Sequence, residues 1–248
     1  MPVLEPIRDA PAATVAVDGE TALVVADYHA GVEEALRRDG VEVTSRAERR
    51  RERLRSLVDR VGATRVIFLG DLGNHIGEPS GAELDELLDL EHALRDVDVT
   101  LVPGNHDGRL GDALAFDVAD GDGVVFGSVG FAHGHSWPAE SVLAADVLAV
   151  GHEHPTVRLT DEIGGSRIER AWLRGALDGA AFADHASSEV VTAVDGELVV
   201  FPAFNDLVGG TWVNVEDQKF LSPFLPAAVP DAEAYLLDGT RLGPFDDV

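Results

Sequence analysis

Residues 22–29 read Ala22-Leu-Val-Val-Ala-Asp-Tyr-His29, five apolar residues followed at once by a carboxylate and then, two residues on, an imidazole. An uninterrupted apolar run of this length predicts a β-strand that is buried on both faces. Asp18-Gly19 lies between the apolar segments Thr14–Val17 and Thr21–Ala26, which is the pattern of a β-hairpin with a type I′ turn. We therefore predict a central strand of a sheet that carries polar side chains at its carboxyl end.

The segments around this strand alternate between helical and strand patterns. Apolar spacing and apolar runs predict helices at Val32–Arg38, Arg46–Val61 and Ala82–Arg95, and strands at Arg65–Leu69 and Val97–Val102. In the third helix, the side predicted to be buried is formed by Leu84, Leu87, Leu88 and Leu94.

The second half of the chain is rich in short strand patterns. They lie at Gly123–Phe126, Val129–His133, Val147–Val150, Val157–Leu159, Arg167–Leu173 and Leu198–Phe201, with one short helix predicted at Pro138–Ala145. Alternating units followed by a strand-rich half indicate an α/β (α+β) fold with two facing mixed β-sheets flanked by helices. Since neither a linker nor a repeat divides the sequence, we expect residues 1–248 to form a single domain that includes the hairpin at 14–26 and C-terminal strands.

The composition is strongly acidic. Asp and Glu number 45 against 19 Lys and Arg, the formal net charge is −26, and Lys219 is the single lysine. This composition resembles that of halophilic proteins, in which molar salt screens the self-repulsion. The absence of cysteine excludes a disulfide framework and a thiol nucleophile. The start, Met1–Pro6, lacks the apolar region of a signal peptide and the chain lacks a membrane-length apolar run, so we expect a cytoplasmic protein without a membrane partner.

Five short polar stretches share one placement, because each of them follows a predicted strand. They are Asp27-Tyr-His29, Gly70-Asp-Leu-Gly-Asn74, Gly104-Asn-His-Asp107, His133-Gly-His135 and Gly151-His-Glu-His154. Six of the nine histidines of the chain lie in these stretches. Loops at the carboxyl ends of strands in α/β sheets converge on one crevice, so we expect these side chains to form one site.

The side chains of these stretches are typical metal ligands. Imidazole, carboxylate and amide groups without sulfur favour Mn²⁺, Fe or Zn²⁺. Side chains two residues apart in an extended loop point to opposite sides, so a His-x-His pair can reach two ions. The ligands are too many for one tetrahedral site. We therefore predict two divalent ions about 3.5–4 Å apart, with Asp71 as the bridging carboxylate.

The order of these motifs, from Asp27 to His154, resembles that of the binuclear metallophosphoesterase (calcineurin-like) family. The tail Phe201-Pro-Ala-Phe-Asn205, followed by Gly209-Gly210, resembles a branch that includes ICC-like archaeal phosphoesterases and the bacterial phosphodiesterases encoded beside DNA ligases. The resemblance implies a four-layer sandwich fold and a phosphoric ester hydrolase. It also implies two divalent ions. Manganese is the favoured metal, and iron, zinc and nickel are the alternatives.

The resemblance further implies a role for each motif residue. One ion would be held by Asp27, His29, Asp71 and His154, and the other by Asp71, Asn105, His133 and His152. His106 would lie over the leaving oxygen of the substrate, and Asp107 would orient the imidazole of His106. Asn74 and His135 would contact the substrate or support the ligands.

Three functions are compatible with these residues. We favour a metal-dependent phosphodiesterase. In this enzyme a hydroxide between the ions attacks a phosphate ester, such as a nucleotide or nucleic acid. The alternative is a DNA nuclease of the Mre11/SbcD kind, which shares the five motifs. A non-catalytic scaffold is least favoured, because such members lose ligands that this chain retains. Association of the chain with further copies of itself, as a homo-oligomer, is a partner interaction that we also expect.

One basic segment stands apart from the motifs. Arg46–Arg60 contains seven of the arginines. They form either a contact for phosphate groups, a subunit contact, or a solvated helix face that pairs with Glu48, Glu52 and Asp59; the solvated face is favoured.

Overall fold

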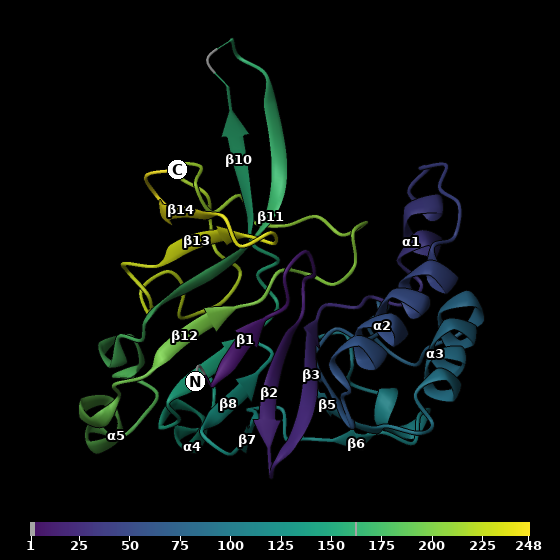
Figure 1. Ribbon diagram of the computed structural model, residues 1–248, viewed down its shortest axis with the longest axis horizontal. Coiled ribbons are helices and arrows are strands. Elements are labelled where there is room, and N and C mark those ends of the chain that lie inside the picture. The colour runs from purple at the N-terminus through teal and green to yellow at the C-terminus, as the bar shows by residue number, and fades with distance from the viewer. Residues whose placement is uncertain (1–2, 162) are drawn as a thin grey trace.

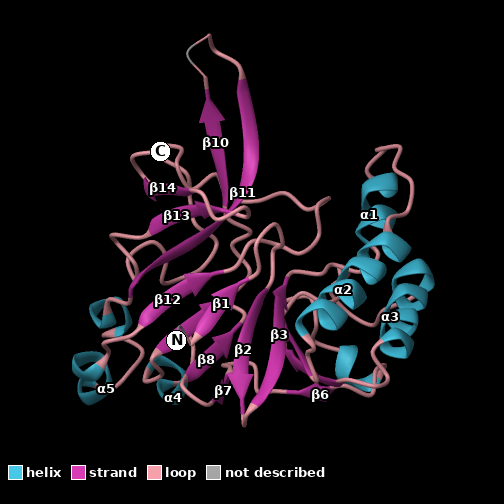
Figure 2. Ribbon diagram, viewed as in Figure 1, coloured by secondary structure: helices cyan, strands magenta, loops and turns pink. Residues whose placement is uncertain are grey.

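The computed structural model describes residues 3–161 and 163–248 and shows two β-sheets packed face to face with helices on the outside (Figures 1 and 2). Met1 and Pro2, the start of the N-terminal segment considered above, lie outside the described residues. Within the described residues the first sheet has six strands, in the order β1 (Leu4–Pro6), β2 (Ala13–Val17), β3 (Glu20–Ala26), β4 (Arg65–Leu69), β5 (Asp98–Val102) and β6 (Asp117–Val118).

The second sheet has eight strands within the same residues. Its order is β14 (Arg241–Pro244), β13 (Glu233–Leu236), β11 (Ser166–Ala176), β12 (Glu197–Val200), β9 (Val147–Val150), β8 (Val129–Ala132) and β7 (Val124–Phe126), and β10 (Thr156–Thr160) pairs with β11. The hairpin of β10 and β11 projects away from the body of the molecule in Figure 1.

Helices cover the outer faces of both sheets (Figure 2). They are α1 (Val32–Arg38), α2 (Ala47–Val61), α3 (Gly81–Ala93), α4 (Glu140–Leu143) and α5 (Ser188–Ala193), with short 3₁₀ turns at Leu110–Asp112 and Gly179–Phe182. In the part of the chain that the structure describes, none of the helices combines the length and the apolar character that a membrane crossing requires.

Three apolar layers hold the four structural layers together, which confirms the predicted sandwich. Alternate residues of β3 serve two of these layers, because successive strand side chains point to opposite faces. Leu23 and Val25 pack with the residues of α2 and α3, whereas Val24 packs with side chains of the second sheet. The outer face of the second sheet packs against α4, the Gly179–Phe182 turn and residues after 220.

The predicted hairpin is confirmed. β2 and β3 pair antiparallel with Val17 opposite Glu20. Asp18 and Gly19 have φ of 52° and 86°, the left-handed values that both central residues of a type I′ turn require. β3 then runs parallel to β4, and β4 runs parallel to β5, so their carboxyl ends lie at one edge of the sheet.

The predicted buried side of the third helix is wrong in part. Leu88 is 44% exposed, whereas Glu83 and Glu86 of α3 are buried. Carboxylates occupy the buried side because each has partners there. Glu83 accepts hydrogen bonds from the backbone N–H groups of Asn74 and His75, and Glu86 pairs with an arginine of α2.

That arginine, Arg50, forms a buried charge cluster with two glutamates. Its Nη2 lies 2.7 Å from Glu86 Oε1 and 3.2 Å from Glu33 Oε2. Glu86 also accepts a hydrogen bond from the backbone N–H of Gly31, and the Arg50 guanidinium lies 5.4 Å from the ring centroid of Tyr28. The cluster therefore joins α1, α2 and α3 to the loop that follows β3.

We expect Arg50→Met to lower the free energy of unfolding at pH 7 by about 3–5 kcal/mol, because it leaves two buried carboxylates without a cation. With Arg50 present, burial raises the pKa of Glu86, while, despite burial, hydrogen bonds from Arg50 and the backbone hold the pKa of Glu33 below its usual value. Without Arg50 both pKa values rise in the folded state, so the loss is largest at neutral pH and shrinks as the pH falls toward the unfolded value of about 4.3. Urea unfolding at pH 7 and at about pH 4.3 measures the free energy of unfolding of the wild-type protein and the variant. Arg60→Met, at an exposed position of the same helix, is the control. Equal losses in the two variants would contradict the role of the cluster.

Candidate metal centre

The structure places all five polar stretches at one edge of the two sheets. Each one follows a strand of a parallel set: Asp27 follows β3, Gly70 follows β4, Gly104 follows β5 by two residues, His133 follows β8 and Gly151 follows β9. The convergence that the sequence predicted is thus present in the fold.

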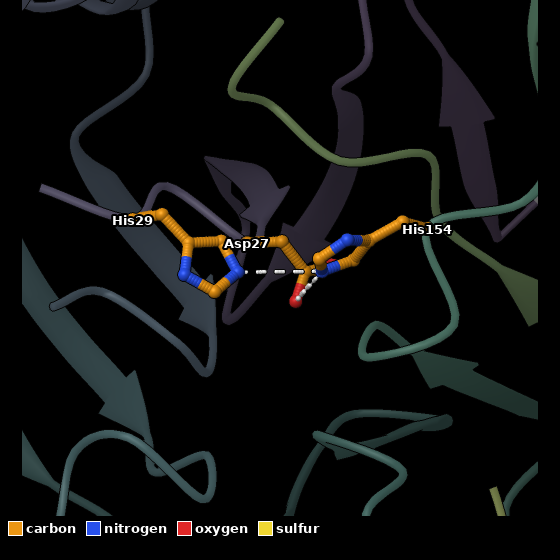
Figure 3. A group of neighbouring side chains, drawn as sticks. All are labelled: Asp27, His29 and His154. Atoms are coloured by element: carbon orange, nitrogen blue, oxygen red, sulfur yellow. Dashed lines mark hydrogen bonds and ion pairs between the residues drawn. The ribbon is translucent and has the colours of Figure 1, made fainter. Parts of the chain in front are cut away.

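One group of donor atoms consists of Asp27, His29 and His154, whose ligand atoms lie within 4.8 Å of one another. His154 Nε2 lies 3.2 Å from Asp27 Oδ1 and 3.3 Å from His29 Nε2. Figure 3 shows the two imidazoles directed at each other, with the Asp27 carboxylate beside His154. This group joins the loop after β3 to the loop after β9.

A second group consists of Asp71, His133 and His152, again with ligand atoms within 4.8 Å of one another. His133 Nε2 lies 3.4 Å from Asp71 Oδ1, and the ring centroids of His133 and His152 are 4.9 Å apart. The side chains come from both sheets, since Asp71 follows β4 while His133 and His152 follow β8 and β9.

Asp71 lies between the two groups. Its Oδ1 is the atom close to His133, while its Oδ2 lies 3.8 Å from His29 Nε2 and 3.8 Å from His106 Nε2. One carboxylate therefore presents each of its oxygens to a different set of imidazoles. A carboxylate that bridges two ions needs this geometry.

The orientation of the imidazoles suits a cation. The Nδ1–H groups of His133 and His154 donate to the backbone carbonyls of Leu69 and Gly209, so in the neutral rings the Nε2 lone pairs point into the groups. His133 Nε2 and His29 Nδ1 are buried and have no hydrogen-bond partner among the described residues. A nitrogen lone pair that faces a carboxylate oxygen favours a cation between them. The residues thus fit divalent ions with N and O ligands.

The electrostatic environment gives the histidines different pKa values. Burial lowers the pKa of His29 and of His152 to about 4, so both rings are neutral at pH 7, as a ligand must be. Burial opposes a proton on His133 as well, but the contact with Asp71 outweighs it and raises the pKa of His133 to about 9. The pKa of Asp71 is lowered despite burial, because His133 and other imidazoles surround it.

The backbone at the groups adopts a sparsely populated conformation. Five of the eight non-glycine residues with positive φ in the described part are candidate ligands, with φ between 46° and 67°: Asp27, His29, Asp71, His152 and His154. Positive φ is uncommon for residues with a Cβ, and such residues cluster at functional sites.

The expected contact of Asp107 with the His106 imidazole is wrong. The buried Asp107 carboxylate accepts hydrogen bonds from the backbone N–H groups of Leu72, Gly73 and Gly104. The Nδ1–H of His106 donates instead to the backbone carbonyl of Asn74, at 2.6 Å. Asp107 thus holds the loops after β4 and β5 together, and the backbone of Asn74 orients His106. Burial raises the pKa of Asp107 to about 6.

Two predicted residues lie at the margin of the groups. Asn105 is exposed in the loop after β5, and its role as a ligand stays a prediction. The ring of His135 lies 5.3 Å from that of His133 and 6.1 Å from that of His152, and its role also stays a prediction.

Sequence reasoning missed two buried residues that hold the ligand loops. Asn205 Nδ2 donates to the backbone carbonyls of Tyr28 and His29. Glu153, between two of the ligand histidines, accepts from the Thr211 hydroxyl and from the backbone N–H groups of Leu221 and Ser222. Two sequence signals could have indicated these residues: the tail motif that ends at Asn205, and the position of Glu153 within Gly-His-Glu-His.

Comparison with known proteins agrees with the site. The sequence profile of calcineurin-like phosphoesterases matches residues 21–175, more than half of the chain, and these residues contain both donor groups. The fold and the site thus define a metallophosphoesterase, which is a class of hydrolase. The chain belongs to the calcineurin-like phosphoesterase family. The more specific branch suggested by the tail stays a prediction.

Two solved structures are similar to this one. Nuclease MPE of Pseudomonas putida has a TM-score of 0.59 and 20% identity, over 96% of this chain and 100% of that chain. YfcE, a phosphoesterase from E. coli, has a TM-score of 0.40 and 16% identity, over 90% of this chain and 96% of that chain. The likeness to nuclease MPE shows a shared fold. Among curated protein sequences, no significant match to this chain is found.

We expect Gly104→Ala to weaken metal binding at least tenfold, the effect typical of a change beside a metal ligand. A Cβ at Gly104 would overlap the carboxylate and the backbone N of Asp71 and crowd the His133 ring, so these candidate ligands must move. A Cβ at Gly108 in the same loop meets nothing within 4 Å. Calorimetric titration of metal-free protein with Mn²⁺ measures the affinity, with Gly108→Ala as the control. Equal affinities in the two variants would contradict the assignment of Asp71.

Proposed function

We propose that this chain is a phosphodiesterase that uses two divalent ions. Membership of the calcineurin-like phosphoesterase family establishes the hydrolase class. One observation supports the use of two ions: the carboxylate of Asp71, which belongs to the second donor group, also lies 3.8 Å from His29 of the first. That arrangement has a place for each of two ions, side by side. The diester preference follows from the resemblance of the tail to the phosphodiesterase branch.

The proposed ligands follow from the two groups. Asp27, His29 and His154 would hold one ion, His133 and His152 with the predicted Asn105 would hold the other, and Asp71 would contribute to both. When bound, the ions neutralise charge on the phosphoryl group and lower the pKa of an attacking water to about 7. Manganese is the proposed metal, with iron, zinc and nickel as the alternatives.

His106 is the proposed catalytic imidazole. Its side chain is 25% exposed, so a substrate can reach it, and its Nε2 lies 3.8 Å from the bridging Asp71. Because Nδ1–H is held by the Asn74 carbonyl, Nε2 is the atom that faces the substrate. In the protonated ring, Nε2–H stabilises or protonates the leaving oxygen.

A nuclease is the second candidate. The observation that favours it is the row of arginines on α2, part of which lines a pocket beside Asn205. The similar fold of a protein named as a nuclease is compatible with this candidate. A non-catalytic scaffold is disfavoured, because both donor groups and His106 are in place.

The substrate class is tested with a panel in Mn²⁺, at low and at molar salt. It contains a phosphomonoester, bis(p-nitrophenyl) phosphate, a cyclic nucleotide and a single-stranded oligonucleotide. We expect the diesters to be hydrolysed faster than the monoester. Turnover of the monoester alone would contradict the phosphodiesterase assignment, and turnover of the oligonucleotide far above that of the simple diester would favour the nuclease.

We expect Asp71→Ala to lose bound metal and activity together, whereas His106→Ala keeps both ions and loses about 10²–10⁴-fold in kcat. Mass-spectrometric metal analysis and hydrolysis of bis(p-nitrophenyl) phosphate measure the two effects. His92→Ala, at an exposed position of α3, is the control. Retained turnover in Asp71→Ala would exclude the bridging role, and loss of metal in His106→Ala would exclude the proposed role of His106.

A further inference from the structure

Arginines recur on one side of α2 and at the residue before it. Arg46, Arg49, Arg50 and Arg53 are spaced by three, four and seven residues, so they lie on one face. Arg50 is buried in its cluster with Glu33 and Glu86. All four arginines line a pocket, although Arg50 is paired in its cluster, and the remaining wall is formed by Phe204, Asn205 and Asp206.

The pocket holds more positive than negative charge. Asp206 is the one carboxylate among its described lining residues, and its Oδ2 lies 3.0 Å from Arg46 Nη1. The Arg53 guanidinium lies 5.4 Å from the ring centroid of Phe204. Arg170 of β11 reaches the same loop, where it donates to the backbone carbonyls of Ala203 and Phe204.

Arg53, in the pocket, and Arg170, beside its wall, are partly withdrawn from water, whereas Arg49 is exposed. Burial lowers the pKa of Arg53 and of Arg170, and for Arg170 the neighbouring charge of Arg53 lowers it further. Two arginines on other sides of α2 have carboxylate partners, since Arg51 lies 3.1 Å from Asp89 and Arg55 lies 3.2 Å from Asp59. Arg49 and Arg53 form no ion pair with the described residues. The interpretation of α2 as a solvated, ion-paired face thus applies to one part of the helix. The side that lines the pocket is different.

The pocket adjoins the metal centre. α2 returns the chain from the carboxyl edge of β3 to the start of β4, so its first turns lie at the same edge as the ligand loops. Asn205, in the wall of the pocket, donates to the carbonyl of His29, and its own N–H donates to the carbonyl of Asp27. One loop therefore separates the arginines from the first donor group.

We propose that Arg49 and Arg53, with Arg170 behind them, form a subsite for a second phosphate group, the one next to the scissile phosphate in a nucleotide chain. Guanidinium groups bind phosphate through paired charge-assisted hydrogen bonds. This inference rests on the proposed diesterase function and adds a substrate preference to it. A diester that carries a neighbouring phosphate is bound and hydrolysed in preference to one that does not.

The test compares the thymidine dinucleotide TpT with its 5′-phosphorylated and 3′-phosphorylated forms. We expect wild-type protein to prefer one phosphorylated form over TpT by about tenfold in kcat/KM, the effect of one charge-assisted contact. In the double variant Arg49→Gln, Arg53→Gln this ratio falls to about twofold. Arg60→Gln, at an exposed position of α2, keeps the wild-type ratio.

The same ratio is measured as dissociation constants of the three dinucleotides for metal-free protein, a readout independent of turnover. A ratio near one in wild-type protein, or an unchanged ratio in the double variant, would overturn the subsite. The single variant Arg49→Gln tests the subsite without disturbing the core, because this side chain is exposed. It must also lower the preference for the phosphorylated dinucleotide. Failure to hydrolyse any diester would overturn the proposed function instead, while the binding ratio still decides the subsite.

Discussion

The buried charge of Asp27 and Asp71 is the constraint on which the rest of the site depends. Both carboxylates are almost fully buried, and a carboxylate without partners is costly to remove from water. Their partners are imidazoles from loops of both sheets and backbone N–H groups of His106 and His152. The five candidate ligands with positive φ add about 1–3 kcal/mol of strain each. A cation bound at these residues stabilises the folded state, because the unfolded chain does not assemble them.

A surrounding set of hydrogen bonds holds this strained arrangement, and much of it comes from residues far away in the sequence. Asn205 fixes the backbone of the loop after β3, and Glu153 ties the loop after β9 to residues 211–222. Asp107 does the same for the loops after β4 and β5. The ligand loops are therefore positioned by buried polar groups whose partners are backbone atoms. Such contacts lock a loop more firmly than exposed side-chain pairs, because leaving a buried N–H group unpaired is costly.

The elements whose signals are local could be predicted from the sequence. Apolar runs revealed the buried strands, Asp18-Gly19 revealed the hairpin, and the motif positions after the strands revealed the donor groups. The local pair of Arg55 with Asp59 is of the kind that the sequence indicated. The partners of Arg50 could not be predicted, because they lie 17 and 36 residues away in the sequence. Arg50 and Glu86 form an ion pair inside the protein although each residue type is typical of a surface. The orienting role that the resemblance implied for Asp107 is wrong because the partners of its carboxylate are backbone N–H groups of two loops, one of which lies 34 to 35 residues away in the sequence.

The net charge of −26 raises the question of how an acidic protein would bind an anionic ester. Screening answers part of it, since at physiological ionic strength surface charges interact over about 8 Å. Groups next to the substrate therefore decide its binding. With two divalent ions bound as proposed, four positive charges face the two negative charges of Asp27 and Asp71, so the centre is locally cationic. The arginine pocket of α2, which we propose as the subsite for a neighbouring phosphate, extends this cationic region along the same edge of the sheet.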